Sequence, residues 1–340
     1  MANPKSEEVE MTPREVISAN IEWNDPERIG FSFTGVEGWR NDFTGAGCNH
    51  GLQEKRWEEG DFEFYTDIWG NVWYRLKHLS KGGEVYKPVL EDWADLDNLE
   101  LPDLDNPAYF EGARQLGASD TDLFRVGWLP GWPFAVCRYM RKMEIYFVDL
   151  LAERERIDVL HDRVTTLLEG VIARYGEAGM DGVMFCEDLG IQDRLLMSPA
   201  MWRDVFRPLY ERLTSKAHEY GVKVIQHSCG YNYELVDDLC EAGIDCLQFD
   251  QPAVYDMPAL AEKLRGHRVG LFAPCDIQLV LPTGDRAHIE AETERMVDIF
   301  RGGLIAKNYG DLHGIGVEPE WDGWAYDTFV RAGCEEKVEV

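Results

Sequence analysis

The chain has 340 residues, of which 45% are hydrophobic, and a formal net charge of −29 from 34 Lys and Arg against 63 Asp and Glu. A surface this acidic repels phosphate backbones and anionic lipids, so neither nucleic acid nor a membrane is an expected partner. No apolar run is long enough to cross a bilayer, and no charged start precedes a short apolar segment, so we expect a soluble, cytoplasmic protein. The eight cysteines form no CxxC pair, and we expect reduced thiols.

The N-terminal part of the chain gives irregular signals. Residues 1–11 are polar and acidic and predict a flexible arm, and Thr12 is the expected N-cap of a first helix. A first strand is expected over Arg28–Thr34, followed by a long glycine-containing loop. The alternating aromatic segment Asp61–Leu76, broken at Gly70, predicts a strand and then a β-hairpin excursion.

The second half repeats a short apolar strand followed by a helix. Its expected strands are Gly182–Cys186, Val222–Gln226, Asp245–Phe249, Arg268–Ala273 and Gly303–Ala306, and a further strand, Leu123–Trp128, precedes them. Repeated β-loop-α units form a parallel sheet, and with the earlier strands the count reaches eight. We therefore predict a single (β/α)8 TIM-barrel domain over residues 12–340. An open doubly wound sheet is the alternative, but no GxGxxG follows the first strand.

One strand end carries two metal-competent side chains. His227 and Cys229 follow the Val222–Gln226 strand two positions apart, so strand alternation places both side chains on one face. Imidazole and thiolate together suit zinc. The structural alternative is a core histidine beside an inert buried cysteine.

The other strand ends in this half are polar as well. In a barrel the chemistry lies where strands end, which makes Glu187, Asp250 and His313 candidate catalytic residues. The alternatives are a helix cap for Glu187, a turn for Asp250 and a solvated side chain for His313. Cys275 is either a third metal ligand or a core residue.

Two further expectations concern side chains near these ends. Strand alternation turns Cys186 away from Glu187, and we expect Cys186 in the core. Five tryptophans of the first half either pack in the core or wall a pocket for a flat apolar ligand. They are Trp39, Trp69, Trp73, Trp128 and Trp132.

The chain resembles the uroporphyrinogen decarboxylase superfamily, and within it the cobamide-dependent methyltransferase branch. The segments that carry the resemblance are Asp67-Ile-Trp-Gly70, Met197-Ser-Pro-Ala-Met-Trp202, His227-Ser-Cys-Gly230, Asp276-Ile-Gln278 and Leu281-Pro-Thr-Gly284. The resemblance covers most of the chain from Thr12 onward. It implies a (β/α)8 barrel in which His227 and Cys229 supply two zinc ligands.

The chain departs from the family pattern at two places. Members that methylate coenzyme M have a cysteine ligand after the last strand, where this chain has Asn308-Tyr-Gly-Asp-Leu-His313. Cys275, His313 or a carboxylate such as Glu187 would have to replace it. The decarboxylases have an arginine-rich segment after the first strand, whereas Phe31–Phe43 contains only Arg40.

The resemblance implies a zinc-dependent methyltransferase that demethylates a small donor and passes the methyl group to cobalt. We expect the donor to be a methoxylated aromatic and the cobalt to belong to a corrinoid (cobalamin) carried by a partner protein. Methyl transfer from methylcobamide to a thiol is one alternative. A metal-free decarboxylase and a non-catalytic binding protein are the others. The family likeness is also compatible with a homodimer joined through loops.

Overall fold

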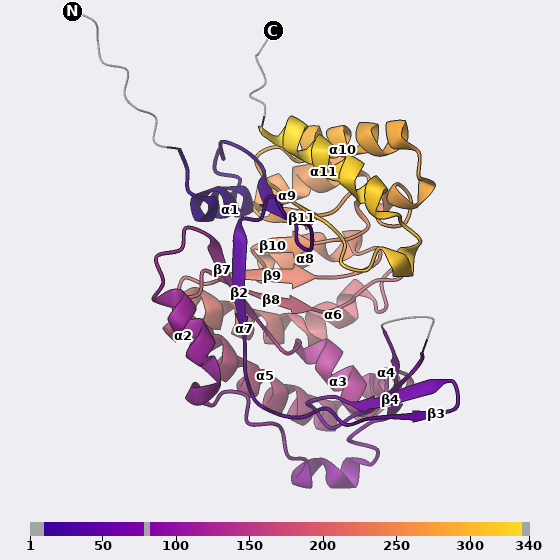
Figure 1. The fold of residues 1–340 in the computed structure, drawn as a ribbon. Helices are drawn as coiled ribbons and strands as arrows, with labels where there is room; N and C mark the ends of the chain where they lie inside the picture. The colour runs from indigo at the N-terminus through magenta and orange to yellow at the C-terminus, as the bar shows by residue number, and fades with distance from the viewer. Residues whose placement is uncertain (1–9, 78–81, 335–340) are drawn as a thin grey trace, which may run out of the picture.

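The computed structural model describes residues 10–77 and 82–334, and its centre is an eight-stranded parallel barrel (Figure 1). The barrel strands are β1 (Gly30–Ser32), β2 (Phe43–Gly47), β7 (Phe124–Trp128), β8 (Gly182–Cys186), β9 (Lys223–His227), β10 (Cys246–Gln248), β11 (Gly270–Ala273) and β12 (Leu304–Lys307). They pair in the order β1-β12-β11-β10-β9-β8-β7-β2, and the ladder does not continue from β2 to β1. The expected (β/α)8 fold is confirmed as a nearly closed barrel. The predicted N-terminal arm falls mostly on residues outside the described ranges.

The second barrel strand is β2, not the aromatic segment expected to supply it. β2 has the sequence Phe-Thr-Gly-Ala-Gly and lies in the stretch expected to be a loop, because its glycines weaken the strand signal. A Cβ added at Gly45 would lie 2.9 Å from the carbonyl oxygen of Val126, so the close approach of β2 to β7 requires glycine.

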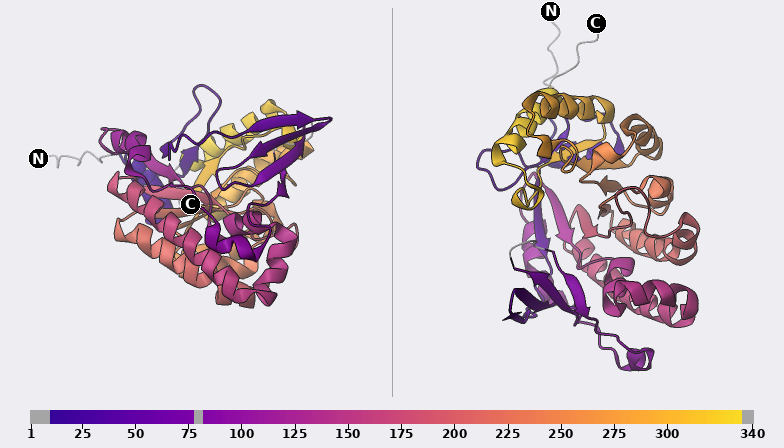
Figure 2. Two further views of the ribbon diagram at one scale, coloured as in Figure 1. Left: turned by 90° about the horizontal axis from the view of Figure 1, so that it is seen from below. Right: turned by 90° about the vertical axis from the view of Figure 1, so that its right-hand side faces the viewer.

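The aromatic segment forms a separate antiparallel sheet, which we call the small sheet. Its strands are β3 (Arg56–Glu59), β4 (Phe62–Thr66), β5 (Val72–Leu76) and β6 (Glu84–Lys87), in that order. It packs against α3 (Pro133–Arg141), where the rings of Trp73 and Tyr139 lie 4.7 Å apart, centroid to centroid. The right-hand view of Figure 2 shows this sheet below the barrel. The excursion that the sequence predicted is therefore a four-stranded sheet.

Helices surround the barrel and close its N-terminal end. α1 (Pro13–Glu22) begins with the expected Thr12 cap and places Ile17 and Ile21 at the bottom of the barrel interior. The others are α2 (Glu111–Gly117), α4 (Met143–Ala152), α5 (Arg154–Glu177), α6 (Pro199–Val205), α7 (Arg207–Glu219), α8 (Val236–Glu241), α9 (Met257–His267), α10 (Arg286–Phe300) and α11 (Pro319–Cys334). Of the described helices, none is both long and apolar enough to cross a membrane.

The direction of each strand's side chains fixes what reaches the mouth of the barrel. Met184 of β8, Ile225 of β9 and Phe272 of β11 pack together in the barrel interior. Because side chains alternate along a strand, residues two positions further on also face inward, at the C-terminal end where barrel proteins place their chemistry. On β8 and β9 these residues are Cys186 and His227, which are register partners.

Candidate metal centre at the barrel mouth

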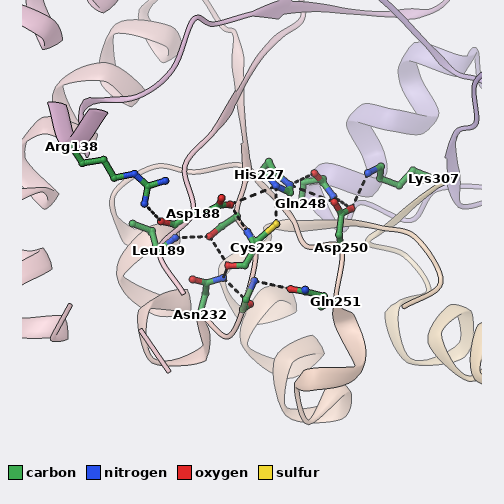
Figure 3. A network of polar contacts seen from close by, with 12 residues as sticks. Arg138, Asp188, Leu189, His227, Cys229, Asn232, Gln248, Asp250, Gln251 and Lys307 are labelled. Atoms are coloured by element: carbon green, nitrogen blue, oxygen red, sulfur yellow. Dashed lines mark hydrogen bonds and ion pairs between the residues drawn. The ribbon is translucent and has the colours of Figure 1, made fainter. Parts of the chain in front are cut away.

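The ends of β8 and β9 bring three metal-competent side chains together (Figure 3). Among the described residues, Asp188, His227 and Cys229 offer donor atoms that all lie within 4.8 Å of one another. Nε2 of His227 lies 3.3 Å from Sγ of Cys229 and 3.7 Å from Oδ1 of Asp188. Ligands of one tetrahedral zinc ion are about 3.4–3.6 Å apart, so the three donors fit a common ion. The expectation that His227 and Cys229 share a face is confirmed.

The loop after β9 is held tightly against the loop after β8. The backbone N–H of Cys229 donates to Oδ1 of Asp188 at 2.8 Å, and the Leu189 N–H donates to the Ser228 hydroxyl at 3.1 Å. Gly230 has a φ of 78°, and a Cβ there would lie 2.6 Å from the backbone of Gly190. Only glycine fits this turn, so the local sequence itself fixes where Cys229 points.

A line of hydrogen bonds sets the tautomer of His227. Lys307 donates to Oδ1 of Asp250 at 2.8 Å, and the amide nitrogen of Gln248 donates to the same oxygen at 2.6 Å. The amide oxygen of Gln248 therefore faces Nδ1 of His227, 2.5 Å away, and accepts a hydrogen bond from the Nδ1–H group. With Nδ1 protonated, Nε2 keeps a free lone pair directed at Cys229 and Asp188. Partners of this kind orient metal-binding histidines and raise their basicity.

The electrostatics of this group favour a cation. Burial raises the pKa of the Cys229 thiol, and the nearby carboxylates of Asp188 and Asp250 raise it further. A positive ion among these groups would reverse both effects by replacing the thiol proton and balancing the carboxylates. One thiolate, one imidazole and one carboxylate form a donor set that suits zinc and leaves a fourth position for a substrate. The donor set therefore fits the metal that the family resemblance implied.

Glu187, predicted as a catalytic residue, lies on the outer face of β8. Its carboxylate is 1% exposed, accepts the Ala135 N–H at the start of α3 at 2.9 Å, and accepts the Tyr210 hydroxyl at 2.5 Å. Burial raises its pKa to about 7, against the lowering effect of these two hydrogen bonds. The structure does not bring Glu187 to the metal-competent group. Asp188 supplies the carboxylate there.

Two other predicted residues also lie apart from the group. Cys275 continues the outward-facing positions of Leu271 and Ala273 and is 3% exposed in the core between barrel and helices, where burial raises its pKa to about 12. His313 is exposed in the short helix His313–Ile315 after β12. Asp250 does join the centre: it accepts a hydrogen bond from Gln248, and its Oδ2 lies 3.9 Å from Nδ1 of His227.

Gln248 and Lys307 were not predicted as site residues from the sequence, and the expectation that Cys186 lies in the core was wrong. Cys186 is exposed at the mouth beside His227, not buried in the core. The missed signal was strand parity. Each of the three lies two positions after an apolar residue of the barrel interior, namely Met184, Cys246 and Ile305.

Two cavities each include one of the tryptophans considered as pocket walls, and neither is lined by Asp188, His227 or Cys229. The mouth cavity, of about 250 Å³, lies on the barrel axis and is lined by Trp128, Phe43, Ile225, Phe272 and Lys307 among others. The side cavity, of about 530 Å³, lies between the small sheet and the helices α3 and α4 and includes Trp73. Trp69 and Trp132 are buried in the core, and Trp39 stacks on Tyr326.

A nearly closed barrel with thiolate, imidazole and carboxylate donors at its mouth defines a metal-competent (β/α)8 protein. A model of the uroporphyrinogen decarboxylase (URO-D) family matches residues 76–322. That match spans more than half of the chain, so the chain belongs to this family, as the resemblance implied.

Comparison with solved structures gives the same fold. A methyltransferase from Methanosarcina mazei superposes with a TM-score of 0.57 at 18% identity, over 74% of this chain and 72% of that one. An HpcH/HpaI aldolase from Desulfitobacterium hafniense DCB-2 gives a TM-score of 0.31 at 13% identity, over 48% of this chain and 68% of that one. At such identities the first likeness shows a shared fold alone, and the second carries no argument. No curated protein sequence is similar enough to count as a match.

Proposed function

We propose that this protein is a zinc-dependent methyltransferase that takes a methyl group from a methoxylated aromatic and delivers it to the cobalt of a corrinoid protein. The observation that carries the proposal is the group formed by Asp188, His227 and Cys229 at the barrel mouth. Membership of the URO-D family and the fold shared with a methyltransferase support it.

The chain's own residues would hold the metal and prepare the donor. Asp188, His227 and Cys229 are the proposed ligands, with Gln248 keeping Nε2 of His227 unprotonated. Zinc held there supplies a Lewis acid that makes an ether oxygen a better leaving group. The methyl–oxygen bond of the donor would break with its electron pair on oxygen, and the corrinoid of the partner protein would supply the nucleophile that accepts the methyl group.

Access and proton supply are also built into the mouth. The Asp188 side chain is 43% exposed, so the metal-competent group can be reached from the loop face, where we propose that the corrinoid protein docks. Lys307 and Asp250 form a mostly buried pair next to the centre and are the proposed source of the proton for the departing oxygen.

The test is a methyl-transfer assay with cob(I)alamin and a panel of methoxybenzenes, followed by the absorbance of methylcobalamin. We expect turnover with zinc, loss of turnover with a chelator, and loss in the His227→Ala variant. Turnover with thiols and methylcobalamin instead would support the thiol alternative. Activity that is unaffected by chelation would overturn the zinc proposal.

A further inference from the structure

The side cavity has walls of mixed character that the proposed zinc chemistry does not explain. Aromatic side chains form much of it, from Trp73 on β5, Tyr139 on α3 and Phe147 on α4. Two cations, Arg138 and Lys142, also line it. Its volume of about 530 Å³ lies within the range of small-molecule binding sites.

Arg138 is a buried cation without an acidic partner. It is 6% exposed, and among the described residues no carboxylate oxygen lies within 4.0 Å of its guanidinium, Glu187 included. Its acceptors are both neutral: the Asp188 main-chain carbonyl at 3.3 Å from Nη1 and the Tyr139 hydroxyl at 3.0 Å from Nη2. Nε is buried and has no partner. A guanidinium has five N–H donors, so this one keeps unused donor capacity. Its charge is offset only from a distance, by the buried carboxylate of Glu187, where it lowers a pKa that burial raises, and by the rings of Phe134 and Tyr139.

The other charged groups around the cavity do not meet this need. Lys142 lies 3.6 Å from Glu144, and Glu84 accepts the Tyr74 hydroxyl at 3.3 Å. The two glutamates offset Lys142 and make the rim acidic. Of the two cations that line the cavity, only Arg138 has no carboxylate within 4.0 Å among the described residues, which favours a ligand that brings one negative charge.

Arg138 also connects the cavity to the metal centre. Figure 3 shows its guanidinium directed at Asp188. The carbonyl of Asp188 accepts from Arg138, while the carboxylate of the same residue belongs to the metal-competent group. A ligand on Arg138 would therefore lie beside a residue that directly contacts Asp188, one of the proposed zinc ligands.

We propose that the side cavity binds an aromatic monocarboxylate, with its carboxylate on Arg138 and its ring among Trp73, Tyr139 and Phe147. A planar guanidinium matches a carboxylate in geometry, and aromatic walls suit a flat ring. This inference rests on the proposed function in one respect: it makes the methyl donor a methoxybenzoate rather than a neutral anisole.

The test measures binding by calorimetry on purified protein without corrinoid, so it does not depend on turnover. Benzoate and 4-methoxybenzoate are compared with benzamide and anisole as neutral counterparts. We expect the wild type to prefer the acids. In Arg138→Gln the affinity for the acids should fall about 10–100-fold, as for loss of a hydrogen bond to a charged group, with the neutral ligands unchanged. Lys142→Gln, on the same cavity, should alter benzoate binding by less than Arg138→Gln.

Equal binding of benzoate and benzamide by the wild type would overturn the inference, and this comparison needs no variant to fold. So would an Arg138→Gln protein that melts at the wild-type temperature and still binds benzoate normally. Acid-selective binding without any methyl transfer would leave the carboxylate site standing and remove the proposed function. Turnover of anisole and 4-methoxybenzoate at equal kcat/KM, without a binding preference for the acid, would support the proposed function and overturn the carboxylate site.

Discussion

Two buried carboxylates follow the strands on either side of β9, and they have different roles. Asp250, beyond β10, is 4% exposed and accepts from Lys307 and Gln248, which links it to His227. Glu187, beyond β8, is 1% exposed and accepts from Tyr210 and from the start of α3. One supports the metal-competent group, whereas the other ties a helix to the back of the sheet.

Strand parity separates these two roles. Asp250 and Gln248 continue the inward face that begins with Cys246, whereas Glu187 follows the outward face of β8. A shift of one position along a strand moves a side chain from the mouth to the helix layer. Chemical type alone therefore does not assign a buried carboxylate to the site, and substitutions on the two faces should separate metal binding from stability.

The largest expected effect is on zinc affinity, on the inner face. Cys229→Ala and His227→Ala should each weaken zinc binding, because each removes a ligand. The loss should exceed about 10–100-fold, which is the effect of removing a hydrogen-bond partner of a ligand. Competition with a chromophoric chelator measures this. Cys275→Ala is the matched control, since Cys275 lies in the outer core, and it should bind zinc like the wild type. Loss of zinc in that control would contradict the placement.

The next effect is on the outer face and depends on pH. Because the pKa of Glu187 is raised from 4.5 to about 7, the folded state binds its proton more tightly than the unfolded state does. Its neutral form favours folding, and stability is lost as the pH rises from about 4.5 through about 7, by roughly 3 kcal/mol in all.

Glu187→Gln should remove that part of the pH dependence. Urea unfolding of wild type and variant at pH 5 and pH 8 measures the difference. The wild type should lose more stability than the variant between the two conditions. Parallel changes in both proteins would mean that Glu187 does not titrate in this range.

A smaller effect separates two glutamines on opposite faces. Gln248→Leu removes the acceptor for Nδ1 of His227 and should weaken zinc binding about 10–100-fold. Gln226→Leu makes the same chemical change on the outer face, where Gln226 contacts Tyr210. Zinc titrations of both variants should show a loss for Gln248→Leu alone, and equal losses would contradict the proposed orientation of His227.

The smallest effect is expected for Tyr210→Phe. It removes the hydroxyl that donates to Glu187 and should lower the free energy of unfolding by about 1–2 kcal/mol. Zinc affinity should stay unchanged, because Tyr210 lies behind the sheet. Chemical denaturation with a parallel zinc titration tests both statements, and a drop in zinc affinity would show that the two faces are coupled.

Much of the fold was predictable, because the strands of the second half are short apolar runs between amphipathic helices. β2 was not, since Phe43–Gly47 gives a weak strand signal and is defined by its close contact with β7. His227 and Cys229 were predictable as a pair from alternation alone. Which face of β8 is the inner one was not, because both faces of a barrel strand are apolar. That is why the outward-facing Glu187 was predicted as a site residue, and why Cys186 was expected in the core.

The measurement that tests the central claim most directly is zinc X-ray absorption of the purified wild-type protein. Our account predicts one zinc ion with a single sulfur neighbour at about 2.3 Å, from Cys229, and nitrogen and oxygen neighbours at about 2.0–2.2 Å. Two or more sulfur neighbours, or a protein that retains no zinc, would contradict it.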